Sequence, residues 1–166
     1  MDFSLRRWGA TEQLPFSSVE AIAQTQDGFL WFAMNGGLGR FDGVTLEVFD
    51  SHNTVSFPVS YVTSLVEAPE GGLWIGTAGG GLLRFREGRF EHFGKAEGLG
   101  NDQIKALSLG QDGKLWIGTD GGGVFVRHPD GRFQAYGNES GLPEPLRPLV
   151  ERYTRIRLAL LRAIIA

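Results

Sequence analysis

The residues with most capacity for chemistry are three histidines, His52, His92 and His128. Their spacings of 40 and 36 residues do not form a local metal-binding motif. The sequence contains no Gly-x-Ser-x-Gly segment that would mark a nucleophilic serine, and it contains no cysteine. We therefore expect no catalytic residue, no metal site and no cofactor. The histidines are interpreted as surface or packing residues.

Carboxylates recur in a second pattern, in which an acidic residue directly precedes glycine. The six pairs are Asp27-Gly28, Asp42-Gly43, Glu70-Gly71, Glu87-Gly88, Asp112-Gly113 and Asp130-Gly131. Asp-Gly suits tight hairpins because both central residues can adopt a positive φ, and Glu-Gly is a weaker form of this signal. We interpret these carboxylates as turn formers. The glycine run 121–123 also predicts a turn, because the lysine and helix of a phosphate-binding loop are missing.

These turns belong to a repeat of about 42 residues. A Leu-Trp pair recurs at Trp31, Trp74 and Trp116, at spacings of 43 and 42 residues, and a glycine cluster follows each pair. An aromatic or apolar pair then ends each unit. The strands expected in the first unit are 18–24, 29–34, 37–42 and 45–50. A four-stranded antiparallel unit of this length is typical of a β-propeller blade.

We therefore predict an all-β protein built of three four-stranded blades. The predicted divisions are an N-terminal outer strand and linker (1–17), three blades (18–59, 60–101 and 102–143) and a tail (144–166). The recurring tryptophans are expected to fill the gaps between blades. Gly28, Gly71 and Gly113 are expected to form the turns between the first and second strands.

The tail departs from the repeat and predicts a C-terminal amphipathic helix. Its apolar residues share one stripe: Leu149, Tyr153, Ile156, Leu160 and Ile164. Three readings remain open. The helix covers the open edge of a blade, the chain is truncated or shifted out of its natural frame, or the helix binds a membrane surface or a partner.

The repeat resembles that of the two-component regulator propeller family. The motif is carried by Leu115-Trp-Ile-Gly-Thr119 and its glycine cluster, and equally by Leu73-Trp-Ile-Gly-Thr77 followed by Gly81-Leu-Leu-Arg-Phe85. The resemblance covers about residues 3–143. It implies a ligand-sensing module of bacterial sensor histidine kinases, hybrid two-component systems or diguanylate cyclases, many of which detect oligosaccharides. It also implies a periplasmic location.

A ligand site is expected where the loops between second and third strands share a rim with the loops between blades. The candidate ligand-binding residues are Asn35, Thr77, Thr119 and Asp120, which can hydrogen-bond a small polar ligand such as an oligosaccharide. We expect a partial propeller completed by further blades or by self-association. The alternatives are a propeller enzyme of the quinoprotein or streptogramin-lyase type, and a purely structural partial propeller.

Net charge and hydropathy limit which other partners can be expected, namely nucleic acids and membranes. The formal net charge of −3 predicts no nucleic-acid partner. The longest apolar stretch, 158–166, is far shorter than the roughly 20 residues that span a bilayer, so we expect no membrane span. No signal peptide is visible at the start, so a chain complete as given is expected to be cytoplasmic.

Overall fold

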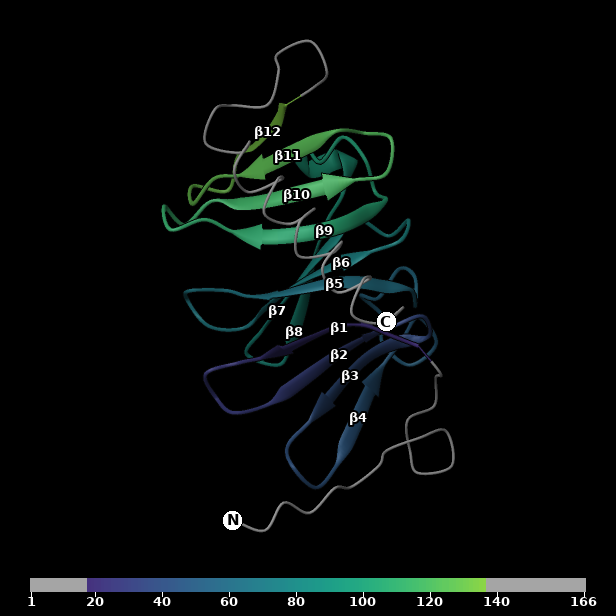
Figure 1. The fold of residues 1–166 in the computed structure, drawn as a ribbon. Coiled ribbons are helices and arrows are strands. Elements are labelled where there is room, and N and C mark those ends of the chain that lie inside the picture. Colours follow the sequence, from purple (N-terminus) through teal and green to yellow (C-terminus); the bar gives the residue numbers. More distant parts are fainter. Residues whose placement is uncertain (1–17, 137–166) are drawn as a thin grey trace, which may run out of the picture. The chain divides into compact units, whose positions relative to one another are not determined.

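A computed structural model describes residues 18–136, which form an all-β fold of three four-stranded antiparallel sheets (Figure 1). The first sheet contains β1 (Val19–Gln24), β2 (Leu30–Met34), β3 (Gly37–Phe41) and β4 (Leu46–Phe49). The second contains β5 (Val62–Glu67), β6 (Leu73–Thr77), β7 (Leu82–Arg86) and β8 (Arg89–Phe93). The third contains β9 (Ile104–Leu109), β10 (Leu115–Thr119), β11 (Val124–Arg127) and β12 (Phe133–Tyr136). A short 3-10 helix, η1 (Lys95–Glu97), follows β8. The predicted blades are confirmed.

Burial differs between strands because each sheet stacks on the next. Every residue of β6 is buried, because β6 lies in the middle sheet with a neighbouring sheet on each side. Its sequence is accordingly a continuous run of apolar and small residues, as in strands covered on both faces. The outer strand β8 is mostly exposed, and only its two phenylalanines, Phe90 and Phe93, are partly buried. The apolar pattern of each strand therefore reflects its place in the stack.

The acid–glycine turns differ from the predicted type in all but one case. Both central residues have positive φ only at Glu87 (51°) and Gly88 (77°). This loop has two residues, and two-residue hairpins require the type I′ geometry. The five other acid–glycine turns are longer, and their acidic residue has no positive φ. In these turns glycine alone takes the left-handed conformation.

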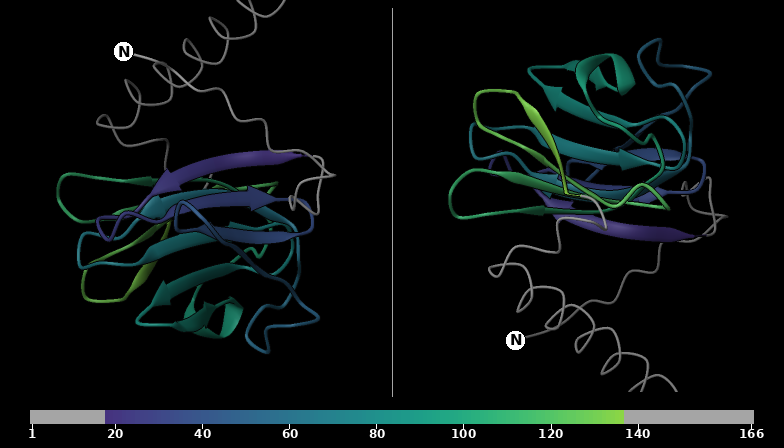
Figure 2. Two further views of the ribbon diagram at one scale, coloured as in Figure 1. Left: turned by 90° about the horizontal axis from the view of Figure 1, so that it is seen from below. Right: turned by 90° about the horizontal axis from the view of Figure 1, so that it is seen from above.

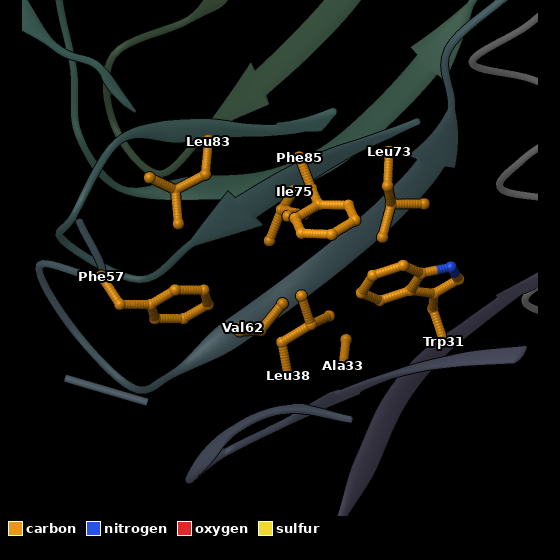
Figure 3. Close-up of a cluster of buried hydrophobic side chains, with 9 residues drawn as sticks. All are labelled: Trp31, Ala33, Leu38, Phe57, Val62, Leu73, Ile75, Leu83 and Phe85. Atoms are coloured by element: carbon orange, nitrogen blue, oxygen red, sulfur yellow. The ribbon is translucent and has the colours of Figure 1, made fainter. Parts of the chain in front are cut away.

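Two of the recurring tryptophans lie in the hydrophobic clusters between sheets. Trp31 is 1% exposed and packs in the cluster between the first and second sheets (Figure 3). Its ring centroid lies 4.9 Å from that of Phe85, which comes from the second sheet. Trp74 is 2% exposed and packs with Leu115 and Phe125 of the third sheet. Trp116 occupies the equivalent place in the third sheet and is partly buried.

The turns gather at two opposite ends of the sheets, which we call rim A and rim B. Rim A consists of the six acid–glycine turns, on the left in Figures 1 and 2. Rim B, on the right, consists of the turns between second and third strands (35–36, 78–81 and 120–123) and the loops between sheets (50–61 and 94–103). This separation follows from the antiparallel order, because successive turns alternate between the two ends.

The chain divides into two compact units, residues 1–135 and 136–166. Of the second unit only Tyr136 is described. The predicted N-terminal strand within 1–17 and the predicted helix within 144–166 therefore lie outside the described residues. Within residues 18–136, no helix has the length and apolarity needed to cross a bilayer.

Candidate functional site

The two predicted threonines lie on rim B, where their hydroxyls bind the glycine turns. The Thr77 hydroxyl donates to the Gly81 carbonyl at 2.7 Å and accepts from the Gly80 amide at 3.1 Å. The Thr119 hydroxyl donates to the Gly123 carbonyl at 2.8 Å. Thr77 is fully buried, whereas Thr119 is partly exposed. The hydroxyl of Thr77 is therefore committed to the turn and offers no surface to a ligand.

The other two predicted residues are exposed on rim B. The carboxylate of Asp120 lies 3.2 Å from the ammonium of Lys105, and both side chains are more than half exposed. Asn35 is exposed in the turn between β2 and β3. Among residues 18–136, no hydrogen bond links Asn35 to Asp120 or to the loops that surround it. Asn35 belongs to the first sheet, whereas the other three predicted residues belong to the second and third sheets.

Gln103 joins the turns of the second and third sheets on rim B. Its carbonyl accepts from the Asp120 amide at 2.9 Å, and it forms a β-bridge with Ala78. The Ala78 amide in turn donates to the Tyr61 carbonyl at 2.9 Å. The side chain of Asn101 donates to the Asp120 carbonyl at 3.1 Å. Backbone bonds thus bring the Thr77 and Thr119 turns together around Gln103, and the exposed Gln103 side chain remains available to a ligand.

Tyr61 and Gln103 are site residues that the sequence analysis missed. Each directly precedes the first strand of its sheet, and Ser18 holds the same position before β1. Tyr61 is 43% exposed. The signal was present in the repeat, because these positions are equivalent and all three residues are polar.

Around Gln103, rim B presents neutral hydrogen-bonding groups together with the Lys105–Asp120 ion pair. The exposed groups are the Tyr61 phenol, the Gln103 amide and the Lys105–Asp120 pair. Amides and hydroxyls both donate and accept hydrogen bonds, and charged groups strengthen such bonds to neutral partners. This set suits a ligand rich in hydroxyl groups.

The histidines make local contacts: His52 and His92 contact rim B segments, and His128 lies on rim A. His92 Nε2 lies 2.9 Å from the Gly80 carbonyl, His128 Nε2 lies 3.0 Å from Gln134 Oε1, and His52 lies 3.7 Å from Asp50. In the described part of the chain, no three His, Asp or Glu side chains gather closely enough to hold a metal ion.

Comparison with family models identifies the repeat. Residues 56–79 and 98–121 match the model described as "Two component regulator propeller". Two of the three repeats thus match the model of this family. The matched segments run from the loop before a first strand to the turn after a second strand. They therefore include Tyr61 and Gln103 together with Thr77, Thr119 and Asp120. No curated protein matches the sequence.

Solved structures share the propeller fold. The extracellular domain of a putative hybrid two-component system from B. thetaiotaomicron is 23% identical with a TM-score of 0.67, over 86% of this chain and 20% of that one. The extracellular domain of a second such putative system is 25% identical with a TM-score of 0.61, over 80% of this chain and 18% of that one. Virginiamycin B lyase from Staphylococcus aureus is 21% identical with a TM-score of 0.60, over 76% of this chain and 42% of the lyase. The chain thus spans about a fifth of the length of the sensor domains.

Proposed function

We propose that this chain is part of the ligand-sensing propeller of a bacterial two-component receptor. In this proposal rim B binds a small polar ligand of the oligosaccharide class, and the chain performs no reaction on it. The propeller lies in the periplasm and passes the binding signal to an output domain. The contact residues are Tyr61, Gln103, Lys105 and Asp120.

The observation that carries the proposal is the arrangement around Gln103. Two turns from neighbouring sheets are held at fixed positions by backbone hydrogen bonds to the loop before β9. Polar side chains are then presented on rigid elements, so little conformational entropy is lost when a ligand binds. A rigid hydrogen-bonding surface without a nucleophile or metal cluster among the described residues suits recognition better than catalysis.

The comparisons support the same proposal at the level of the domain. The family model is described by two-component regulation, and two similar solved structures are extracellular domains of putative hybrid two-component systems. The lyases share the fold, but no residue on rim B favours their chemistry over recognition. The sensing role is therefore the function that the rim supports best.

A matched pair of variants tests the proposal. Gln103 is exposed on rim B, whereas Gln111 is exposed on rim A in the turn between β9 and β10. Removal of one hydrogen-bonding side chain from the site is expected to weaken binding roughly three- to tenfold. We expect Gln103→Ala to weaken binding of an oligosaccharide selected from a panel of neutral glycans, and Gln111→Ala to leave it unchanged, by isothermal titration calorimetry.

Two results would count against the proposal in different ways. If no glycan in the panel binds to the wild-type chain, the ligand class is wrong. If a glycan binds and both variants behave alike, binding takes place away from rim B.

A further inference from the structure

A cleft of about 400 Å³ opens between the second and third sheets on rim A, at the opposite end of the sheets from rim B. Its walls combine apolar and charged residues and come from both sheets and their turns. Pro69 and Trp74 belong to the second sheet, and Leu109, Leu115 and Pro129 belong to the third. Three arginines, Arg84, Arg86 and Arg127, also line the cleft, with the single carboxylate of Glu70.

Two of these arginines lie over the same aromatic ring. The guanidinium carbon of Arg84 is 5.1 Å from the centroid of Trp74, and that of Arg127 is 4.8 Å from it. Arg84 is 9% exposed and pairs with Glu70 at 2.5 Å. Among residues 18–136, Arg127 has no ion pair and no hydrogen bond, although it also lies over the ring of Phe93 at 5.4 Å. The cleft therefore holds more positive than negative charge.

The Nε atoms of Arg84 and Arg127 are both buried without a hydrogen-bond acceptor. A buried donor without an acceptor costs free energy, and native structures contain few of them. Burial lowers the pKa of Arg127, and the neighbouring charge of Arg84 lowers it further. The carboxylates of Glu70, Glu91 and Asp130 oppose this shift, but among residues 18–136 none of them forms an ion pair with the Arg127 guanidinium.

The repeat shows that packing alone does not require an arginine at this position. Arg127 pairs with Leu115 across β10 and β11, just as Phe85 pairs with Leu73 across β6 and β7. Phe85 is 8% exposed and packs on Trp31 between the first and second sheets, with a centroid distance of 4.9 Å. The third sheet thus places a cation where the second sheet places an apolar ring. The packing seen in the second sheet thus does not require a cation at this position, and a bound anion would give Arg127 Nε the acceptor that it lacks.

We propose that this cleft binds the oxyanion of a small molecule, a carboxylate, sulfate or phosphate group, between Arg84 and Arg127. A guanidinium presents parallel N–H donors that match two oxygens on one centre, so the anion supplies acceptors for both buried Nε groups. Partial burial of both guanidinium groups strengthens their attraction to the bound anion. This site is independent of glycan binding at rim B.

Titration with inorganic anions tests the proposal directly. At constant ionic strength, millimolar phosphate or sulfate is expected to raise the Tm of the wild-type chain above its value in chloride. The rise in Tm should level off as the anion concentration increases, as it does when a site fills. Arg127→Gln is expected to weaken anion binding at least about tenfold, because it removes a charge-assisted hydrogen bond. Arg132→Gln is the matched control, because Arg132 is exposed and paired with Asp130 at 2.7 Å. The same titration with glucuronate, which carries a carboxylate, and with glucose, which is neutral, distinguishes carboxylate binding from sugar binding.

A second variant guards against loss of folding. Arg127→Phe restores the residue type found at Phe85, so we expect it to fold, to unfold at a higher temperature than the wild type and to bind no anion. In the wild type, the NMR signal of the Arg127 Nε–H group is expected to shift on addition of phosphate. An equal rise in Tm for the wild type, Arg127→Gln and Arg127→Phe would overturn the proposal, as would an unmoved Nε–H signal.

Discussion

At the scale of single residues, the acidic members of the turns act through hydrogen bonds to the backbone. Asp42 Oδ1 accepts from the amides of Thr45 at 2.6 Å and Val44 at 2.8 Å. These bonds favour the ionised form and lower the pKa of Asp42 below its usual value. Hydrogen bonds from Lys114 and Arg132 lower the pKa of Asp112 and Asp130 in the same way. The carboxylates thus stabilise the turns in their charged state.

Acidification is therefore expected to destabilise the chain through these turns. Since each carboxyl has a lower pKa in the folded state, its contribution is present above the unfolded pKa near 3.8 and is lost as pH falls through the folded pKa. Asp42→Asn keeps an acceptor oxygen but removes the titrating group. We predict that the free energy of unfolding, measured with urea at pH 6 and pH 3, falls less for Asp42→Asn than for the wild type. An equal fall in both would show that Asp42 does not contribute.

The carboxylate of Glu70 has a second role besides its place in a turn, because it contacts a residue that is distant in the sequence. Glu70 precedes glycine like the others, but its side chain pairs with Arg84 of β7. The local pattern predicted a turn, and the turn is present. The ion pair was not predictable, because it depends on the register that places Arg84 opposite Trp74 and within reach of the turn. The same argument applies to Arg127, whose place over Trp74 depends on stacking between sheets.

At the scale of the elements, the strands were largely predictable. The first unit was expected to have strands at 18–24, 29–34, 37–42 and 45–50, and the structure gives bounds within one residue at each end. The alternation of apolar residues and the turn residues determine structure locally, so both can be recognised in a single sequence. The contacts between sheets are not local. For this reason the sequence analysis named Asp120 as a candidate but not Tyr61 and Gln103, which become neighbours of the turns only after the sheets stack.

A pair of glycines tests this stacking. Gly76 and Gly118 hold equivalent positions in β6 and β10. A β carbon on Gly76 would lie 2.6 Å from Cγ2 of Ile104 in the third sheet and in closer contact with the Ser64 hydroxyl, whereas one on Gly118 would lie no nearer than 3.7 Å to Ala106. Neither glycine has a positive φ, so the difference is steric.

We therefore predict that Gly76→Ala lowers the free energy of unfolding by about 1–3 kcal/mol, the usual cost of overpacking. Gly118→Ala is the control and is expected to change it by less than about 0.5 kcal/mol, as substitutions without a steric conflict do. Chemical denaturation measures both. Equal effects of the two variants would show that the second and third sheets do not pack as described.

At the scale of the whole molecule, the described residues supply three blades, whereas closed propellers typically contain four to eight. The matched 86% of this chain covers 20% of the extracellular domain of a putative hybrid two-component system. Completion of the ring by further blades or by self-association therefore stays a prediction. The network around Gln103 on rim B does not require a closed ring, because it lies within the second and third sheets and the loop between them.

The central claim is that rim B, and not another surface, binds the polar ligand. Hydrogen–deuterium exchange of the wild-type chain with and without a bound oligosaccharide tests it most directly. We predict slower exchange on binding at the amides of Ala78, Gly79, Gln103 and Asp120, with no change in the rim A turns at 68–72 and 110–114. Protection confined to rim A, or protection absent from rim B at saturating ligand, would contradict the account.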